Sequence, residues 1–245
     1  MFLSGPEQRS LKQCFGLLAQ DLNEREIRER LGQATRDLLR ADYFASYVWD
    51  AASDRFDHGV SLDMDPVNLG RYEGWYQFHD PITFLLQSQR HATLVSEVMP
   101  HAALVRTEFF NDFLALDGLH WGINLHAFDG DTALGDMRIW RSRRRREFEP
   151  RDKLLLDLLE PALVAALRRA RSAASAARLA TLPVVALSGR EKEVARCVCR
   201  GLTDKEIARE LGISQPSVRT YLRRVFDKLG VSRRAGLSQQ AASFS

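Results

Sequence analysis

The sequence predicts an α+β fold: an N-terminal α-β-α sandwich with an antiparallel sheet, followed by a small all-α domain. Helical and strand-like segments alternate up to residue 149, a long helical pattern follows, and the last quarter shows only helical spacing. The 245 residues, 45% hydrophobic and 27% charged, suffice for two hydrophobic cores. We predict domains over residues 1–172 and 184–245, with a linker over 173–183.

The N-terminal elements follow from hydrophobic spacing. Residues 7–22 and 25–39 carry apolar positions three and four apart, which predicts two helices. Residues 43–50 and 55–61 read as a hairpin joined by "AASD". A short helical region follows, ending near Asp80-Pro81, and then a strand over 92–98 and a helix over 105–118 closed by Gly118.

The second half of this domain is expected to hold a hairpin and a long helix. In residues 120–128, Trp121, Ile123 and Leu125 alternate with Gly122, Asn124 and His126, the period of a half-buried strand. Residues 132–140 complete the hairpin after "DGD". A helix is expected from Pro150 to about residue 180, interrupted at Pro161, and its apolar stripe fades into Ala, Ser and Arg toward the predicted linker.

The small domain fits helix-turn-helix geometry. Ala208 lies where two crossing helices must come close, Gly212 at a turn that needs positive φ, and Val218 faces back into the pair. The expected helices run from about residue 203 to 211 and from 215 to 229. Ser214 is suited to cap the second helix, and Pro216 is tolerated in its first turn.

Charge favours an anionic polymer as the partner of this domain. Residues 184–245 hold 12 Lys and Arg against 6 Asp and Glu, a net charge of +6, whereas the rest holds 23 against 26, a net charge of −3. Arg219 and Arg223 are four apart and share one helix face, opposite Val218 and Leu222. In a DNA major groove, guanidinium groups can form bidentate hydrogen bonds to guanine. The alternative is that both arginines are ordinary surface residues that only keep this helix face in contact with solvent.

Residues 187–237 resemble the four-helix DNA-binding domain of LuxR-type transcription regulators. That resemblance rests on Leu187, Arg190, Glu191, Val194, Gly201, Lys205, Glu206, Ile207, Ala208, Leu211, Gly212, Ser214, Val218, Lys228, Leu229 and Val231. It implies double-stranded DNA as the partner, with base contacts by Gln215, Arg219, Thr220 and Arg223 and phosphate contacts by Thr203, Lys205, Ser217, Tyr221 and Arg224. Ser217 and Tyr221 depart from the Thr and His common in the family. A final helix after Ser232 would pair two such domains, so a homodimer is expected, and RNA polymerase is a possible further partner.

The large domain resembles the autoinducer-binding domain of quorum-sensing LuxR proteins and, more widely, GAF- or PAS-like sensors. The resemblance lies in the order of Tyr72, Asp80-Pro81-Ile82, "EFFNDF" and "GLHWGI". It implies a small-molecule site at Tyr72, Trp75, Tyr76, Asp80, Trp121 and Gly122. The resemblance is partial, because this chain has Asn68 where the family has its first tryptophan and Val95-Ser96 where the family has its second. An acyl-homoserine lactone, another ligand and no ligand therefore all stay open. Asp80 is either a ligand acceptor or a helix cap, and the aromatic residues are either pocket or core.

Other classes of function find less support in the sequence. The six histidines lack metal-ligand spacing, no cofactor is expected, and no arrangement of nucleophile and base predicts an enzyme. A sigma-factor-like promoter subunit would share the helix-turn-helix pattern. Such a subunit would also need a second basic, aromatic-rich helix that melts promoter DNA, and the sequence has no such segment. Arginines at residues 138–146 are interpreted as a solvated loop tip. With no signal-like start and no apolar run of about 20 residues, the chain is expected to be cytoplasmic, without membrane contact.

Overall fold

The computed structural model describes residues 3–51, 53–181, 187–231 and 237, and side chains as far as residue 177 in the long helix. It divides into two compact units, Met1–Ser175 and Ala176–Ser245. The predicted linker, residues 173–183, is helical as far as Thr181, and residues 182–183 lie outside the described part.

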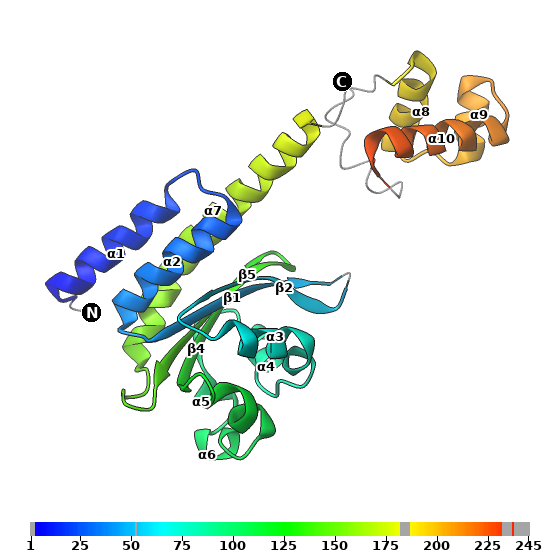
Figure 1. Cartoon of the computed structure of the whole chain (residues 1–245). Helices are drawn as coiled ribbons and strands as arrows, with labels where there is room; N and C mark the ends of the chain where they lie inside the picture. The colour runs from blue at the N-terminus through cyan, green and yellow to red at the C-terminus, as the bar shows by residue number, and fades with distance from the viewer. Residues whose placement is uncertain (1–2, 52, 182–186, 232–236, 238–245) are drawn as a thin grey trace. The chain divides into compact units, whose positions relative to one another are not determined.

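The N-terminal unit is built on a five-stranded antiparallel sheet in the order β2-β1-β5-β4-β3 (Figure 1). Its strands are β1 Tyr43–Asp50, β2 Arg55–Leu62, β3 Thr93–Leu94, β4 Leu119–Asp129 and β5 Thr132–Ser142. In the register of β4 and β5, Asn124 lies opposite Arg138 and His126 opposite Asp136. These pairs place four polar side chains on one face of the sheet.

Helices cover both faces of the sheet, which confirms the predicted α-β-α sandwich (Figure 1). One face packs against α1 Gly5–Leu18, α2 Glu24–Leu39 and α7 Pro150–Thr181. The other face packs against a layer of short helices: α3 Pro66–Gly74, η1 Tyr76–Phe78, α4 Thr83–Gln87, α5 Val95–Val98, α6 His101–Leu104 and η2 Phe110–Leu114.

Two predicted elements are shorter than expected. The strand over 92–98 is wrong beyond Leu94, because the carboxylate of Glu97 accepts from Leu94 N at 2.9 Å and begins α5. The helix over 105–118 starts only after Thr107, whose hydroxyl accepts from Phe110 N, and it widens into the π-helical turn η2. Gly118, at φ +78°, ends the turn that follows, as predicted.

Two further expectations are corrected. β4 is buried on both faces rather than one, because the layer of short helices covers the side that alternation assigns to solvent. α7 is one continuous helix through Pro161. Leu159 and Leu163 on either side of the proline are both buried in the first core, and this packing holds the helix where the ring removes one hydrogen bond.

The C-terminal unit contains α8 Gly189–Cys199, α9 Asp204–Leu211 and α10 Gln215–Leu229 around its own core. Lys228 near the end of α10 pairs with the buried Glu191 of α8 at 2.7 Å. This hydrogen-bonded ammonium lowers the pKa of the Glu191 carboxyl. Leu237 is buried in the same core, but the predicted final helix after Ser232 otherwise lies outside the described residues.

Candidate functional sites

The helix-turn-helix has the predicted local geometry. Gly212 ends α9 at φ +62°, where a residue with a Cβ would be strained. Ser214 caps α10, its hydroxyl accepting from Ser217 N at 3.2 Å, and Pro216 lies in the first turn. Val218, Leu222 and Val225 are buried, which fixes the rotation of α10 about its axis.

That rotation leaves the predicted base-reading face of α10 in solvent. Gln215, Arg219, Thr220 and Arg223 are all exposed. Arg219 Nε lies 3.5 Å from Asp204 at the start of α9, and the arginine side chain remains 74% exposed. The contact places the start of α9, where Thr203 and Lys205 are also exposed, beside the α10 face.

The remaining residues predicted to contact phosphates differ in their exposure to solvent. Arg224 is exposed, whereas the Ser217 hydroxyl is engaged with Ser214 at 2.8 Å. Tyr221 packs half-buried against the core of the domain. Their DNA contacts stay predictions, but the structure brings all nine predicted positions onto α10 and the first turn of α9.

In the N-terminal unit, a cavity lies between the sheet and the layer of short helices. It measures about 30 Å³ and is walled by aromatic and aliphatic side chains, with Asn124 and Arg138 on the sheet side and Tyr72, Asp80 and Thr83 on the helix side. Ligand pockets typically measure about 300–1,000 Å³, so the cavity is nearly filled by its own walls.

Of the six predicted ligand contacts, Tyr72 and Asp80 line this cavity. Trp75 is 54% exposed and stacks on His79, so it is neither core nor cavity wall. Tyr76 is buried, and its hydroxyl accepts from Arg71. Trp121 packs against the core on the opposite face of the sheet. Gly122 affects the cavity wall only indirectly, because its missing side chain leaves room for Trp140. A Cβ at Gly122 would lie 2.8 Å from the ring of Trp140, which forms part of the wall.

Asp80 acts as a cap. Its carboxylate accepts from Ile82 N at 2.8 Å and Thr83 N at 3.0 Å, and the Thr83 hydroxyl also donates to it. Burial raises the pKa of Asp80, against the opposing effect of these hydrogen bonds. Asp80 therefore holds the turn that leads into α4, which begins at Thr83 rather than at the predicted Pro81, and the residue also lines the cavity.

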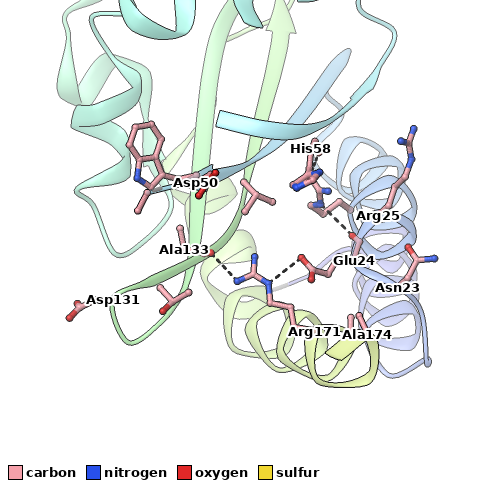
Figure 2. A pocket seen from close by; sticks show the side chains of 15 residues that line it. Asn23, Glu24, Arg25, Asp50, His58, Asp131, Ala133, Arg171 and Ala174 are labelled. Atoms are coloured by element: carbon pink, nitrogen blue, oxygen red, sulfur yellow. Dashed lines mark hydrogen bonds and ion pairs between the residues drawn. The ribbon is translucent and has the colours of Figure 1, made fainter. Parts of the chain in front are cut away.

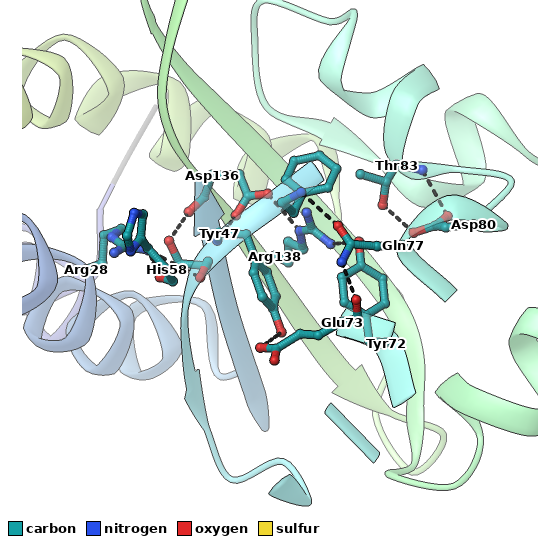
Figure 3. Close-up of polar contacts among 12 residues, drawn as sticks. Arg28, Tyr47, His58, Tyr72, Glu73, Gln77, Asp80, Thr83, Asp136 and Arg138 are labelled. Atoms are coloured by element: carbon teal, nitrogen blue, oxygen red, sulfur yellow. Dashed lines mark hydrogen bonds and ion pairs between the residues drawn. The ribbon is translucent and has the colours of Figure 1, made fainter. Parts of the chain in front are cut away.

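Arg138 is the principal residue that the sequence pattern did not reveal. It lies in β5 and is only 6% exposed, and Arg141 of the same strand is half-buried and donates to Leu39 O, so the interpretation of residues 138–146 as one solvated tip is wrong at both arginines. Figure 3 shows its guanidinium surrounded by Asp136, Tyr47 and Tyr72. Nε donates to Asp136 at 2.7 Å, and Nη1 donates to the Tyr72 hydroxyl.

The electrostatics of this cluster follow from burial and pairing. Burial alone would lower the pKa of Arg138, but Asp136 and Tyr72 outweigh it and raise that pKa. Burial raises the pKa of Tyr72 to about 12. The guanidinium also lies 4.5 Å from the Phe56 ring centre, a cation–π distance. The cluster therefore holds one permanent ion pair inside an apolar core.

A larger hollow of about 780 Å³ lies where α2, α7 and the strand ends meet (Figure 2). Arg171 crosses it, donating to Ala133 O and Leu134 O at 3.1 Å and pairing with Glu24 at 3.2 Å. Arg28 donates to the His58 carbonyl at 2.7 Å. Both arginines are therefore already engaged with groups of the protein itself.

In the portions of the chain with assigned structure, no three His, Cys, Asp or Glu side chains gather to hold a metal ion. Over those same segments, every helix falls short of the length and apolarity needed to cross a bilayer. Cys14 and Cys197 are buried and Cys199 is half-buried, all three as free thiols.

The fold and exposed face of the C-terminal unit define a helix-turn-helix domain. Residues 185–241 match the model of "Bacterial regulatory proteins, luxR family", and this domain belongs to that family. Over 53 residues it is 42% identical to the probable transcriptional regulatory protein SgaR of Hyphomicrobium methylovorum, covering 22% of this chain and 25% of SgaR. Over 56 residues it is 41% identical to the putative HTH-type transcriptional regulator Mb0914c of Mycobacterium bovis, covering 23% and 6%. The chain thus matches a quarter or less of these relatives.

Solved structures resemble the fold over a longer span. Escherichia coli SdiA aligns with a TM-score of 0.60 and 17% identity, covering 97% of both chains. CepR2 of Burkholderia cenocepacia, an N-acylhomoserine lactone dependent LuxR family transcription factor, aligns at 0.50 with 18% identity over 72% of this chain and 99% of that one. A GAF domain from Coxiella burnetii aligns at 0.53 with 14% identity over 69% and 97%. At these identities the likeness shows the fold alone, and it agrees with the predicted α+β architecture.

Proposed function

We propose that this protein is a sequence-specific, DNA-binding transcription regulator whose N-terminal unit controls the C-terminal domain. The observation that carries the proposal is the exposed face of α10, where Arg219 and Arg223 point away from a fixed apolar stripe. The net charge of +6 over residues 184–245 attracts a polyanion, and α10 has the dimensions of a major-groove helix. Gln215 and Thr220 would complete the base contacts, with Thr203, Lys205 and Arg224 on phosphates.

Pairing of two chains would match a two-fold DNA site. Leu154 and Leu158 lie one turn apart on α7 and are about half exposed, at 53% and 51%. We propose that this strip of α7 meets its equivalent in a second copy, so that two C-terminal domains act together in the cytoplasm. RNA polymerase would be a further partner of the bound dimer.

A receptor for an acyl-homoserine lactone is the less favoured form of the proposal. SdiA has been solved in complex with octanoyl-rac-glycerol, so a related fold accepts an acyl chain. Here the cavity of about 30 Å³ has no room for such a chain unless its walls separate. Asn68, which replaces the family's first tryptophan, is itself bonded to Phe113 O and Asp117.

We expect Arg223→Ala to weaken specific DNA binding by about 1–3 kcal/mol and to relax selectivity at one base pair, because one base contact is lost. The operator sequence would be selected from a random duplex pool with the full chain and then titrated with each variant. Arg190→Ala is the matched control, since Arg190 is paired with Glu193 on α8. Unchanged affinity and unchanged preference for Arg223→Ala would remove α10 from the role of reading helix.

A further inference from the structure

Two histidines that are far apart in the sequence meet at the start of β4. His101 is the first residue of α6 and His120 the second residue of β4, and their Nε2 atoms lie 3.1 Å apart. The two positions are 19 residues apart, so the sequence shows no ligand spacing and only the fold brings the rings together. Both side chains are half-buried, which leaves the pair within reach of a small ion from solvent.

A β-bulge aims His120 at this place. In the register of β4 and β5, Leu119 pairs with Ser142 and Trp121 pairs with Arg141. β4 therefore advances by two residues where β5 advances by one, and His120 is the extra residue. In a regular strand His120 and Trp121 would point to opposite faces of the sheet. Here their rings meet edge to face with centres 4.7 Å apart, so the bulge has turned both side chains to one side.

Aromatic rings hold both imidazoles in position. The Trp121 ring packs against His101 with ring centres 4.2 Å apart and 32° between the planes. The Phe110 ring lies edge-on to both, 6.0 Å from His101 and 5.8 Å from His120 between ring centres. Packed rings keep their rotamers, so a ligand of the two nitrogens would not have to order them on binding.

The geometry of the pair suits a shared cation better than a hydrogen bond. The ring centres are 4.4 Å apart, so the rings do not meet end to end as a linear N–H···N bond between the nitrogens requires. With metal–nitrogen bonds of about 2.0–2.1 Å, two nitrogens 3.1 Å apart make an angle of about 100° at a shared ion. That angle lies between the angle of about 90° in tetragonal copper or nickel sites and the angle of about 109° in tetrahedral zinc sites.

The electrostatics of the pair favour neutral imidazole, which is the form that binds a metal ion. Burial lowers the pKa of His120, and His101 and Arg143 add smaller effects in the same direction. Two protonated rings at this distance would repel each other, whereas one cation between them can accept a lone pair from each. Arg143 would oppose a bound cation, but its side chain is exposed, so solvent and salt screen its charge.

We propose that His101 and His120 together bind one divalent transition-metal ion of the kind that imidazole prefers, zinc, copper or nickel, through their two Nε2 atoms. In the part of the chain that the structure describes, no third His, Cys, Asp or Glu side chain joins the pair, so water fills the remaining positions. Structural zinc sites have four protein ligands, and a site with two binds its ion reversibly. This inference goes beyond the proposed function and does not rest on it.

The test uses the full chain, freed of metal with a chelator, and Zn²⁺ as the probe in a calorimetric titration. Because the protein supplies two of the four ligands of a structural zinc site, we expect about half of the binding free energy of such a site, which gives a dissociation constant on the order of 1–100 μM. His101→Gln and His120→Gln should each weaken this binding at least about tenfold. His79→Gln is the matched control, since His79 also stacks on a tryptophan, at 3.9 Å, but its Nδ1 pairs with Trp75 O.

A second measurement locates the ion without altering either histidine. Ni²⁺ held by His101 and His120 would lie beside the Trp121 ring and should quench its fluorescence over the concentration range in which it binds. Trp121→Phe should lose this quenching and keep most of the Zn²⁺ affinity. Three outcomes would overturn the proposal: unaltered Zn²⁺ binding by both histidine variants, no saturable Zn²⁺ binding at ten times the highest expected constant, or Ni²⁺ quenching that persists in Trp121→Phe.

Discussion

Asp136→Asn is expected to lower the free energy of unfolding of the N-terminal unit by about 3–5 kcal/mol. Asp136 is 3% exposed and pairs with the Nε of Arg138 at 2.7 Å. Asparagine would keep an acceptor for Tyr47 N, now bonded at 2.6 Å, but it would leave the guanidinium as an uncompensated buried charge. The expected loss of stability therefore comes mainly from the uncompensated charge of Arg138 and less from lost hydrogen bonds.

Urea unfolding followed by tryptophan fluorescence measures this change, since all four tryptophans lie in the N-terminal unit. Asp131→Asn is the control, because Asp131 is fully exposed and its pair with Arg90 is 3.5 Å long, so no measurable loss is expected. Equal stability of Asp136→Asn and the unmodified protein would mean that Arg138 is not held as a buried ion pair.

Acid is expected to destabilise the N-terminal unit through His126. Burial lowers the pKa of His126 to about 4, with Asp136 opposing the shift and Arg138 adding to it. The unfolded chain binds a proton at this residue near pH 6.5, whereas the folded chain does not until about pH 4. The contribution of His126 to the free energy of unfolding is therefore fully present above pH 6.5. It falls by about 3 kcal/mol as the pH drops to 4.

Urea unfolding at pH 7, 5.5 and 4.5 tests this prediction on the unmodified protein and on His126→Gln, which should lose most of the pH dependence. His120, whose pKa burial and His101 also lower, leaves a smaller dependence in the same direction. The raised pKa of Asp80 acts in the opposite sense, since it favours the folded state as the pH falls. His79→Gln, at an exposed ring, should keep the parent profile. A parent-like profile for His126→Gln would contradict the assignment.

The helix-turn-helix could be predicted from the sequence because its determinants are local. Ser214 caps a helix that begins at the next residue, and Gly212 supplies the left-handed turn before it. The stripe that includes Val218 and Leu222 then decides which arginines face solvent. Each of these effects acts within one turn of helix, so spacing alone placed the elements to within one residue of the observed ends.

The cavity could not be predicted in the same way, because it depends on which elements cover the sheet. Asn124, His126 and Arg138 alternate with apolar residues, a pattern typical of a solvent-facing side of a strand. A second layer of short helices buries that side instead. Trp75 shows the converse error, since an aromatic residue among core residues was expected inside and is exposed. In both cases tertiary packing, which has no local signature, decides burial.

The salt dependence of duplex binding tests the central claim most directly. The full chain would be titrated with its selected duplex at several salt concentrations, alongside Lys205→Ala. If α10 docks in the groove with Lys205 on a phosphate, the logarithm of the binding constant falls steeply with the logarithm of salt, and Lys205→Ala reduces that slope by about 1. A protein that binds no duplex at low salt, or whose binding is indifferent to salt, would contradict the account.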